Sequence, residues 1–385
     1  MELALYDSES GYYARAAQRS GRAGDFFTSV DVGPVFGELL ARQVIEMAGL
    51  VDDQSSVVSG QSSVVSHQSS VVSRQSSVVS RQSSVDLVDA GAGNGRLSAD
   101  ILRAVHRESP ALYDRLRLHL VEASGSARAA QRETLGDVAD RLASSSPRLP
   151  ESFSGILIAN ELLDAMPVHQ VVMRPEGLRE IYVTTGDSRR ETEDWRLKTT
   201  EGAPSTPALA EHLDRAGVKL EPGWRVEINL RAVEWVREAV RRLTRGFIIL
   251  IDYGHPAREL YSATHATGTL TTFSRHTTAG PERPGGQPPW LEHPGEQDIT
   301  AHVDFSSVRR AAEDEGAEAI ALLDQTYFLL GLGAAEIEAP ELKTRLAIKT
   351  LLMPGGLGST LKVLIVGKGV ERPSLRGCSF GVRLT

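Results

Sequence analysis

Three glycines at alternate positions link two segments of different character in LVDAGAGNGRL. Residues 85–91 predict a short buried strand, and residues 94–109 predict a helix with one apolar face. Gly91, Gly93 and Gly95 fall on the turn between them, where glycine lets the chain turn tightly and lets a ligand approach the backbone. The helix N-terminus adds free N–H groups and a partial positive charge. The pattern favours a nucleotide-type ligand, with a purely structural glycine turn as the alternative.

A glutamate ends the second predicted strand. Residues 116–124 (LRLHLVEAS) are rich in apolar side chains up to Glu122, and a second helix is predicted over residues 125–143. A carboxylate at this strand end can accept hydrogen bonds from both ribose hydroxyls of a nucleoside. The alternative is a surface glutamate that caps the helix beginning near Ser124. Acidic residues at strand ends are common. Glu122 therefore supports a nucleoside site only in combination with the glycine turn.

Polar residues also end the third predicted strand, residues 154–161 (SGILIANE). Asn160 and Glu161 close this strand and Asp164 follows one turn on, so all three fall at the carboxyl edge of the sheet. A carboxylate there could hold a guanidinium by paired hydrogen bonds, or accept a proton released in a reaction. Asn160 could position a substrate nitrogen. In the alternative interpretation, Glu161 and Asp164 only cap a short helix.

The N-terminal segment SGRAGDFFTSVDVG is polar and aromatic without a core-like period, which is typical of a flap over a bound ligand. Asp25 and Thr28 are its candidate ligand contacts. The alternative is an irregular loop that places two phenylalanines in a core.

Four histidines lie in the segments IDYGHP, LTTFSRH and PGEQDITAHVDF and between them: His255, His276, His293 and His302. No pair has the H-x-x-x-H spacing of a metal site and no cysteine lies near, so the sequence predicts no metal. A lone histidine is more often a satisfied polar group, and His302 is interpreted as structural or as a support for the site.

These residues need a scaffold in which strand ends meet. Strands alternate with helices along the chain, and further strands are predicted at residues 246–254 and 361–367. Such alternation predicts an α/β fold, a doubly wound parallel sheet whose ligand lies beyond the C-terminal ends of the strands.

Changes of composition along the chain divide it into segments. We expect an N-terminal lid and helix (1–50), a low-complexity insertion (51–85), the first half of the core (86–166), an inserted substrate subdomain (167–230), the second half of the core (231–368) with a Pro/Gly-rich loop at 278–297, and a tail (369–385).

A seven-residue unit, QSSVVSG and its variants, is repeated within residues 54–86. Its valines are adjacent rather than spaced as a coiled-coil seam, and most other positions are serine or glutamine. Such a segment cannot bury enough apolar surface to offset its ordering entropy, so we predict a disordered insertion, with a short β-type tract as the alternative. We expect deletion of residues 54–84 to leave ligand binding intact, because loop entropy changes slowly with length.

Composition excludes several classes of protein. The 385 residues are 41% hydrophobic and 24% charged, as in ordinary globular proteins, and a net charge of −8 disfavours broad nucleic-acid binding. The longest apolar runs are too short for a membrane span. A single cysteine, Cys378, and an N-terminus unlike a signal peptide favour a reducing compartment, and we expect a cytoplasmic protein.

Eight motifs follow one another along the chain: GYY, GDFFTS, FGELLARQ, VDAGAGNGRLSADIL, LVEAS, NELLDAMPVHQ, IDYG and PGEQDITAHVDF. In this order they resemble the MidA family of class I S-adenosylmethionine-dependent methyltransferases, which is related to the mitochondrial complex I assembly methyltransferase. The glycine spacing also resembles class I methyltransferases rather than the dinucleotide pattern G-x-G-x-x-G. Asp89 stands where family members usually have glutamate, and the seven-residue repeat is no part of the family pattern.

The resemblance implies a Rossmann-like class I methyltransferase sheet and S-adenosylmethionine as methyl donor. The cofactor would then be bound by Asp89, Gly91, Ala92, Gly93, Gly95, Glu122, Asp25 and Thr28, and the catalytic residues would be Asn160, Glu161 and Asp164. For the mitochondrial relatives the resemblance implies methylation of an arginine on a respiratory complex I subunit, so we expect a protein substrate, without nucleic acid or membrane insertion.

Three points stay open at this stage. The protein could methylate a small molecule or another protein residue. It could also be a cofactor-binding assembly factor without turnover. The sequence does not fix the oligomeric state, and a homodimer is one option.

Overall fold

The computed structural model describes residues 1–14, 28–58, 83–185, 197–274, 277–280, 288–338, 341–353 and 357–380. Asp25, His276 and residues 59–82 of the repeat lie outside these ranges, so the expectations for them stay predictions. Helix α2 (Val35–Val58) continues beyond its expected end near Leu50 into the first residues of the repeat. Extending a helix costs little once it has formed, which accounts for a helical turn in this glutamine- and serine-rich sequence.

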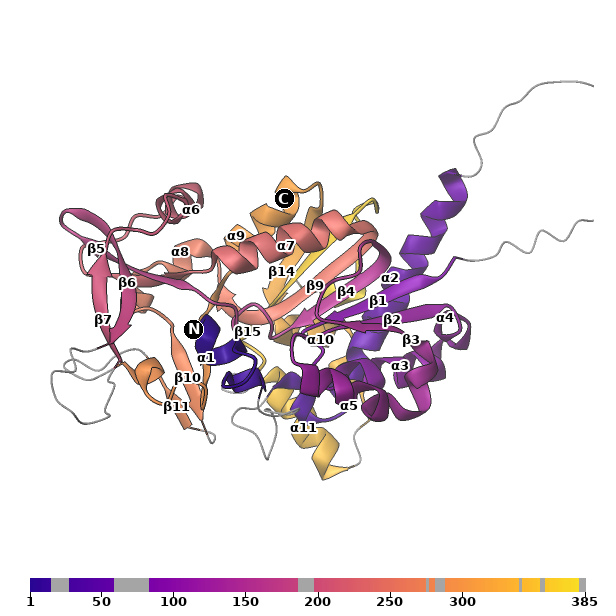
Figure 1. The fold of residues 1–385 in the computed structure, drawn as a ribbon. Helices are drawn as coiled ribbons and strands as arrows, with labels where there is room; N and C mark the ends of the chain where they lie inside the picture. Colours follow the sequence, from indigo (N-terminus) through magenta and orange to yellow (C-terminus); the bar gives the residue numbers. More distant parts are fainter. Residues whose placement is uncertain are drawn as a thin grey trace, which may run out of the picture.

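Within the described residues, eight strands form a central, mostly parallel sheet (Figure 1). Its order is β14-β15-β9-β4-β1-β2-β3, with β13 paired to β9, and β15 runs antiparallel to both of its neighbours. The strands are β1 (Val85–Ala90), β2 (Leu116–Val121), β3 (Leu142–Ser146), β4 (Phe153–Asn160), β9 (Leu243–His255), β13 (Val303–Asp304), β14 (Glu318–Asp324) and β15 (Leu361–Lys368).

The central strands end together at one edge of this sheet. Ala90 of β1 pairs with Val121 of β2 and with Ala159 of β4. Asn160 of β4 pairs in turn with Ile251 of β9. The chain order reverses between β1 and β4, which is the switch point where open α/β sheets bind their ligands. The segments that follow these strands therefore meet.

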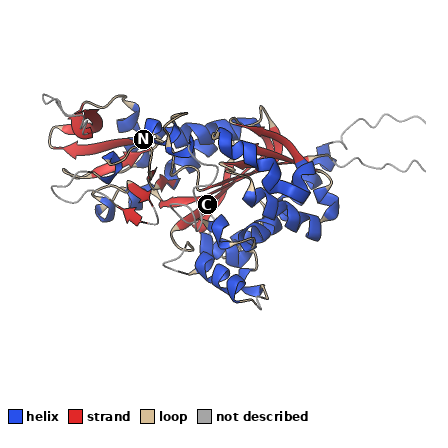
Figure 2. Ribbon diagram, turned by 60° about the horizontal axis from the view of Figure 1, so that its bottom comes forward, coloured by secondary structure: helices blue, strands red, loops and turns tan. Residues whose placement is uncertain are grey.

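Helices cover both faces of the sheet, as Figures 1 and 2 show. The central strands β1, β4, β9 and β15 bury both of their faces, which requires continuous apolar runs such as FIILI in β9. One face packs against α2, α3 (Arg96–Glu108), α10 (Gln325–Gly331) and α11 (Leu342–Leu352), and α5 (Gly125–Leu135) lies against α3. The other face packs against α7 (Leu230–Arg242) and α9 (Phe305–Asp314).

Two smaller antiparallel sheets lie at one end of the central sheet (Figure 1). The first has the order β7-β6-β5-β8 and lies in the segment expected to be an inserted subdomain; its strands are β5 (His169–Arg174), β6 (Gly177–Thr185), β7 (Leu197–Gly202) and β8 (Arg225–Ile228). The second, β11-β10-β12, comprises β10 (Thr271–Ser274), β11 (Thr277–Ala279) and β12 (Asp298–Thr300).

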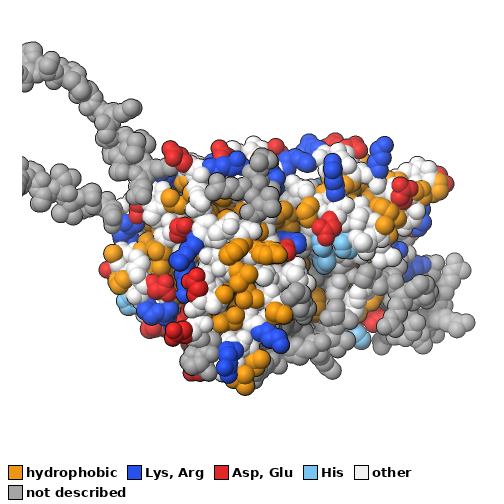
Figure 3. All heavy atoms as spheres, turned by 180° about the vertical axis from the view of Figure 1, so that it is seen from behind, with side chains coloured by type: hydrophobic (Ala, Val, Ile, Leu, Met, Phe, Trp, Pro, Cys, Tyr) orange, Lys and Arg blue, Asp and Glu red, His pale blue; other side chains and the backbone are white. Residues whose placement is uncertain are grey.

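The remaining helices are short. They are α1 (Glu2–Tyr6), η1 (Tyr12–Ala14), η2 (Ser29–Val32), α4 (Pro110–Tyr113), η3 (Gly136–Arg141), α6 (Ala208–Ala216), α8 (Ala257–Leu260), η4 (Ala263–His265), η5 (Pro289–Leu291), η6 (Ala334–Glu336) and η7 (Arg376–Cys378). Among the described residues, no helix combines the length and hydropathy that crossing a bilayer requires. The face of the molecule in Figure 3 carries basic and acidic side chains interspersed with hydrophobic ones.

The predicted doubly wound α/β fold is confirmed. The single helix predicted over residues 125–143 is divided in the structure: α5 ends at Leu135, a 3-10 helix follows over Gly136–Arg141, and residues 142–143 belong to β3. Gly136 follows with a φ of 55°, a value that glycine adopts without strain, and the chain leaves the α-helical path there. η3 and the edge strand β3 come next, and the sequence LASSS of β3 has too few apolar residues to indicate a strand.

Candidate functional site

The glycine turn is held on the end of β2 by backbone hydrogen bonds. The N–H groups of Gly91 and Ala92 both donate to the Val121 carbonyl, at 2.9 and 3.1 Å. Gly95, with a φ of 87°, begins α3 from the left-handed region. Gly93 has a φ of 52°, and a Cβ added there would meet no heavy atom of the described residues within 4 Å. The turn therefore leaves open space beside Gly93.

Glu122 lies beside the glycine turn and joins it to the next helix. Its Oε2 accepts a hydrogen bond from the Gly93 N–H at 2.9 Å, and its Oε1 accepts one from the Ser124 N–H at 2.7 Å. The Gly93 carbonyl accepts a further bond from Gln131 Nε2 at 2.8 Å. A carboxylate oxygen has two lone pairs, so each oxygen of Glu122 keeps one acceptor position for a ligand hydroxyl. The geometry is compatible with both helix entry and ribose binding.

Asp89 makes its hydrogen bond to helix α3. Its side chain is buried, and Ser98 Oγ donates to its Oδ2 at 2.6 Å. Burial raises the pKa of Asp89 to about 6, although the hydrogen bond from Ser98 acts in the opposite direction. The residue thus joins β1 to α3 behind the glycine turn, and a direct cofactor contact stays a prediction.

Glu161, directly after β4, has an unusual backbone. Its φ of 51° lies in the left-handed region, which costs a non-glycine residue about 1–3 kcal/mol and is frequent at functional sites. Its N–H donates to the Ile251 carbonyl at 2.8 Å. Its Oε1 accepts hydrogen bonds from the Ser29 N–H at 3.1 Å and from Asn160 Nδ2 at 3.2 Å. The carboxyl is therefore held where β4, β9 and the N-terminal segment meet.

Asn160 leaves one polar atom without a partner. Its Oδ1 is buried and accepts no hydrogen bond within the described part of the chain. A buried acceptor without a donor costs about 1–3 kcal/mol, and such an atom calls for a ligand or water. Asn160 therefore offers an acceptor beside the Glu161 carboxyl.

Asp252, on β9, completes this group of acids, although the sequence did not single it out. Its Oδ2 accepts hydrogen bonds from the N–H groups of Leu162 and Leu163 at 3.1 and 2.7 Å. It thereby holds the turn that carries Glu161 and Asp164. Its signal in the sequence was an aspartate directly after the apolar run FIILI, at the carboxyl end of a buried strand.

Burial changes the protonation of all three acids. Burial raises the pKa of Glu161 to about 8, and the neighbouring Asp164 adds to the shift. Burial also raises the pKa of Asp252 to about 7. The pKa of Asp164 is raised well above its ordinary value by burial and by the charge of Asp252. A cation placed among these groups would favour their ionised forms, so the cluster suits a cationic ligand.

Thr28 begins a short helix that reaches the site. Its hydroxyl donates to Asp31 Oδ2 at 2.9 Å, and its own N–H donates to the same oxygen at 3.0 Å. Asp31 also forms an ion pair with Arg96, at the start of α3. This arrangement places η2 so that the Ser29 N–H reaches Glu161. Thr28 is thus a cap of η2 in this structure, and its contact with the cofactor stays a prediction.

Two N-terminal tyrosines also reach the site, and the sequence did not predict them. Tyr6 Oη donates to the Ala165 carbonyl at 3.0 Å, and Tyr13 Oη donates to Asp298 Oδ1 at 2.8 Å. Their rings are stacked with centroids 5.4 Å apart. The first residues of the chain therefore lie against the turn after β4 and against β12.

The switch-point edge, the glycine turn and the acid after the second strand together define a Rossmann-like, nucleoside-binding class of protein. Comparison with known protein families shows which nucleoside-binding proteins this chain belongs with. The chain belongs to the Methyltransf_28 family of S-adenosyl-L-methionine-dependent methyltransferases, whose sequence model matches residues 70–322. It is therefore an S-adenosylmethionine-dependent methyltransferase, and the resemblance to the MidA family is confirmed.

Individual relatives agree with this assignment. The chain is similar to the crystal structure of a COG1565 superfamily member from Burkholderia thailandensis bound to S-adenosylhomocysteine, at 30% identity and a TM-score of 0.79, covering 99% of this chain and 89% of that one. The mitochondrial protein arginine methyltransferase NDUFAF7 of Mus musculus is 28% identical, over 86% of this chain and 69% of its own length. The Drosophila melanogaster homolog is 26% identical, over 96% and 80%.

These comparisons correct one prediction. The expected cytoplasmic location is contradicted, because the animal relatives are mitochondrial proteins by name.

The residues at the switch point fit the cofactor. The open space beside Gly93 admits a ligand to the backbone, and the two free acceptor positions of Glu122 match the two hydroxyls of a ribose. These features lie at the edge where doubly wound sheets bind nucleosides.

Proposed function

We propose that this methyltransferase acts on an arginine side chain of a protein substrate. The animal relatives are named protein arginine methyltransferases, which supports the proposal by similarity. The observation that carries it is the group of carboxyls formed by the half-buried Glu161 and the buried Asp164 and Asp252, beside the unpartnered Oδ1 of Asn160. A planar guanidinium offers five N–H donors and a charge that such a group accommodates.

The acceptor would be held by the turn after β4. A guanidinium beside Glu161 favours the ionised carboxylate, which can then accept paired, charge-assisted hydrogen bonds. Asn160 Oδ1 accepts a further N–H, and Asp252 keeps the turn in place through its bonds to Leu162 and Leu163. Fixing the acceptor nitrogen in this way supplies much of the rate, since reaction within a positioned pair avoids the entropy of encounter.

S-adenosylmethionine supplies a methyl group on a sulfonium sulfur. The arginine nitrogen that receives the methyl must lose a proton, and the protein needs a nearby base. Glu161 holds a proton more tightly than an ordinary carboxyl, which makes it the better acceptor near neutral pH. Asp164 is the second candidate, with a pKa raised by burial.

The cofactor side of the site is assigned to the glycine turn. Gly91, Ala92 and Gly93 would lie against the methionine portion, and Glu122 would accept the ribose hydroxyls. Gly95 begins the helix whose N-terminus favours the negative end of the ligand, the carboxylate.

The test is transfer of an isotope-labelled methyl group. The purified protein is incubated with labelled S-adenosylmethionine and a mitochondrial lysate, and labelled residues are identified by mass spectrometry. We expect label on arginine that is lost in Glu161→Gln and retained in Glu133→Gln, whose side chain is exposed on α5.

Other outcomes identify the alternatives. Label on another residue or on a small molecule would refute arginine specificity. Binding of S-adenosylmethionine without any labelled product would identify a cofactor-binding assembly factor. Because of the resemblance to the complex I assembly methyltransferase, we expect the acceptor to be a respiratory complex I subunit. Label found only on other proteins would refute this choice of substrate.

A further inference from the structure

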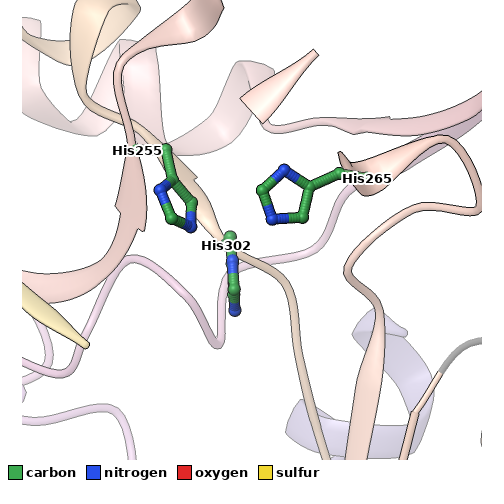
Figure 4. Close-up of side chains that lie close together, drawn as sticks. All are labelled: His255, His265 and His302. Atoms are coloured by element: carbon green, nitrogen blue, oxygen red, sulfur yellow. The ribbon is translucent and has the colours of Figure 1, made fainter. Parts of the chain in front are cut away.

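Three histidines that are distant in the sequence come together beside the C-terminal end of β9. His255 ends β9, His265 ends η4, and His302 lies between β12 and β13. One ring nitrogen of each lies within 4.8 Å of a ring nitrogen of the other two, and Figure 4 shows the rings around a common space. All three are partly exposed, so an ion could reach them from solvent.

Glu259 lies beside two of these rings. Its Oε1 lies 2.8 Å from His255 Nδ1, and its main-chain carbonyl lies 3.1 Å from His265 Nδ1. The carbonyl oxygen only accepts, so His265 Nδ1 carries the hydrogen and its Nε2 presents a lone pair. The Glu259 carboxylate is close enough to His255 Nδ1 for a charged pair, but this nitrogen makes no hydrogen bond among the described residues. A ligand histidine in a metal site usually donates its second nitrogen to a carboxylate or a carbonyl in this way.

His302 adds a nitrogen whose hydrogen-bonding capacity is unused. Its Nδ1 is buried and has no hydrogen-bond partner among the described residues. Leaving a buried polar atom unpaired is unfavourable, and an ion at the common space would remove that cost. The rings do not stack in parallel: the His255 and His265 planes meet at 42° and those of His265 and His302 at 70°. Ring stacking alone therefore does not account for the cluster.

We propose that His255, His265 and His302 bind one divalent transition-metal ion, Zn²⁺, through three imidazoles. Imidazole suits zinc and its neighbours in the periodic table, whereas magnesium and calcium prefer oxygen ligands. Zinc–nitrogen bonds of about 2.0–2.1 Å in a tetrahedral site bring ligand nitrogens to about 3.4 Å of one another, so the side chains close in by small torsional changes. The fourth position is left to water.

The ion would fasten the segment after β9 to the strand that carries Asp252. β13 pairs with β9 at His255, and the N–H of Ala301, next to His302, donates to the Asp164 carbonyl at 3.0 Å. A bond between His255 and His302 therefore closes a long loop beside the acidic group. Closing a long loop stabilises the folded state. Here it would also hold β13 and residues 301–302 in place beside Asp164 and Asp252.

The test measures zinc binding by the full-length protein. After treatment with EDTA, the protein is titrated with ZnCl₂ against a chromophoric competing chelator, and bound metal is counted by mass spectrometry. We expect one equivalent of zinc. We expect affinity to fall at least about tenfold in His265→Gln and in His302→Gln, and about 10–100-fold in Glu259→Gln. His106→Gln, on the exposed face of α3, is the matched control and should bind as the wild type does.

Failure of the wild type to retain zinc, or equal affinity in wild type and His302→Gln, would overturn the site. Circular dichroism and S-adenosylmethionine binding verify that each variant folds. If the His302 variant does not fold, cobalt(II) substitution of the wild type decides: intense visible bands of a four-coordinate ion support the site, and the weak spectrum of hydrated cobalt refutes it.

Discussion

Single side chains at the edge of the sheet make more than one contact each. Glu122 holds Gly93 and Ser124 while it keeps acceptor positions free, and Glu161 joins Ser29 to Asn160 from a strained backbone. A substitution at either residue therefore affects structure and binding together. Each test needs a control variant and a readout that separates the two effects.

Glu122→Ala should weaken S-adenosylmethionine binding at least about tenfold. Each hydrogen bond to a carboxylate contributes about 1.5–3 kcal/mol, and 1.4 kcal/mol corresponds to a factor of ten. Titration calorimetry measures the change, and Glu133→Ala, exposed on the adjacent helix α5, should leave affinity unaltered. If Glu122→Ala binds as tightly as wild type, the assignment to the ribose is wrong.

Glu161→Gln should change how stability depends on pH. The folded protein raises the pKa of this carboxyl from 4.5 to about 8, so the fold binds its proton more tightly than the unfolded chain does. This contribution is complete below the unfolded pKa and is lost as pH rises toward 8. We expect the variant to gain about 2–4 kcal/mol of unfolding free energy relative to wild type between pH 5 and pH 8.5. Denaturant titrations at both pH values measure it, and a constant difference would contradict the assignment.

At the scale of elements, the site depends on where strands stop. β1, β2 and β4 end in register, and β9 runs beside the end of β4 and continues beyond it, so the turns after β1, β2 and β4 converge next to β9. Continuous apolar runs made these four strands predictable. Strand β7 and the strands of the second small sheet were harder to predict, because they are short, polar and stabilised mainly by partners elsewhere in the chain.

Gly93→Ala should weaken cofactor binding more than it weakens the fold. A side chain at a φ of 52° strains the backbone, and its Cβ would enter the open space beside the turn. Gly177→Ala is the matched control: Gly177 too has a positive φ and would give an unobstructed Cβ, but it is the first residue of β6. Calorimetry measures the affinity of each variant for S-adenosylmethionine, and thermal unfolding measures the stability of each variant. Equal affinity for S-adenosylmethionine in the two variants would argue against a cofactor contact at Gly93.

At the scale of the whole molecule, the N-terminal segment contacts parts of the site that lie far away along the chain. Tyr13 reaches Asp298, a residue 285 positions later, and Ser29 reaches both Glu161 and Gln325. None of these contacts follows from local sequence, because each depends on how the N-terminal segment lies over the sheet edge.

Tyr13→Phe should loosen the N-terminal segment without unfolding the core. The variant removes the hydrogen bond to Asp298 and keeps the ring that stacks on Tyr6, at a cost of about 1–2 kcal/mol. Limited proteolysis should cleave the first residues faster than in wild type. Tyr327→Phe, exposed on α10, should behave as wild type, and equal cleavage of Tyr13→Phe would show that the contact is unimportant.

The sequence by itself determined the doubly wound fold, the glycine turn and the candidates Glu122, Asn160, Glu161 and Asp164, because apolar periodicity and polar strand ends are local signals. Only the tertiary structure brought Asp252 to the same turn, Tyr13 to Asp298, and His255, His265 and His302 to one another. These groups are far apart along the chain, and their distances are set by strand register and by packing, which no local pattern encodes.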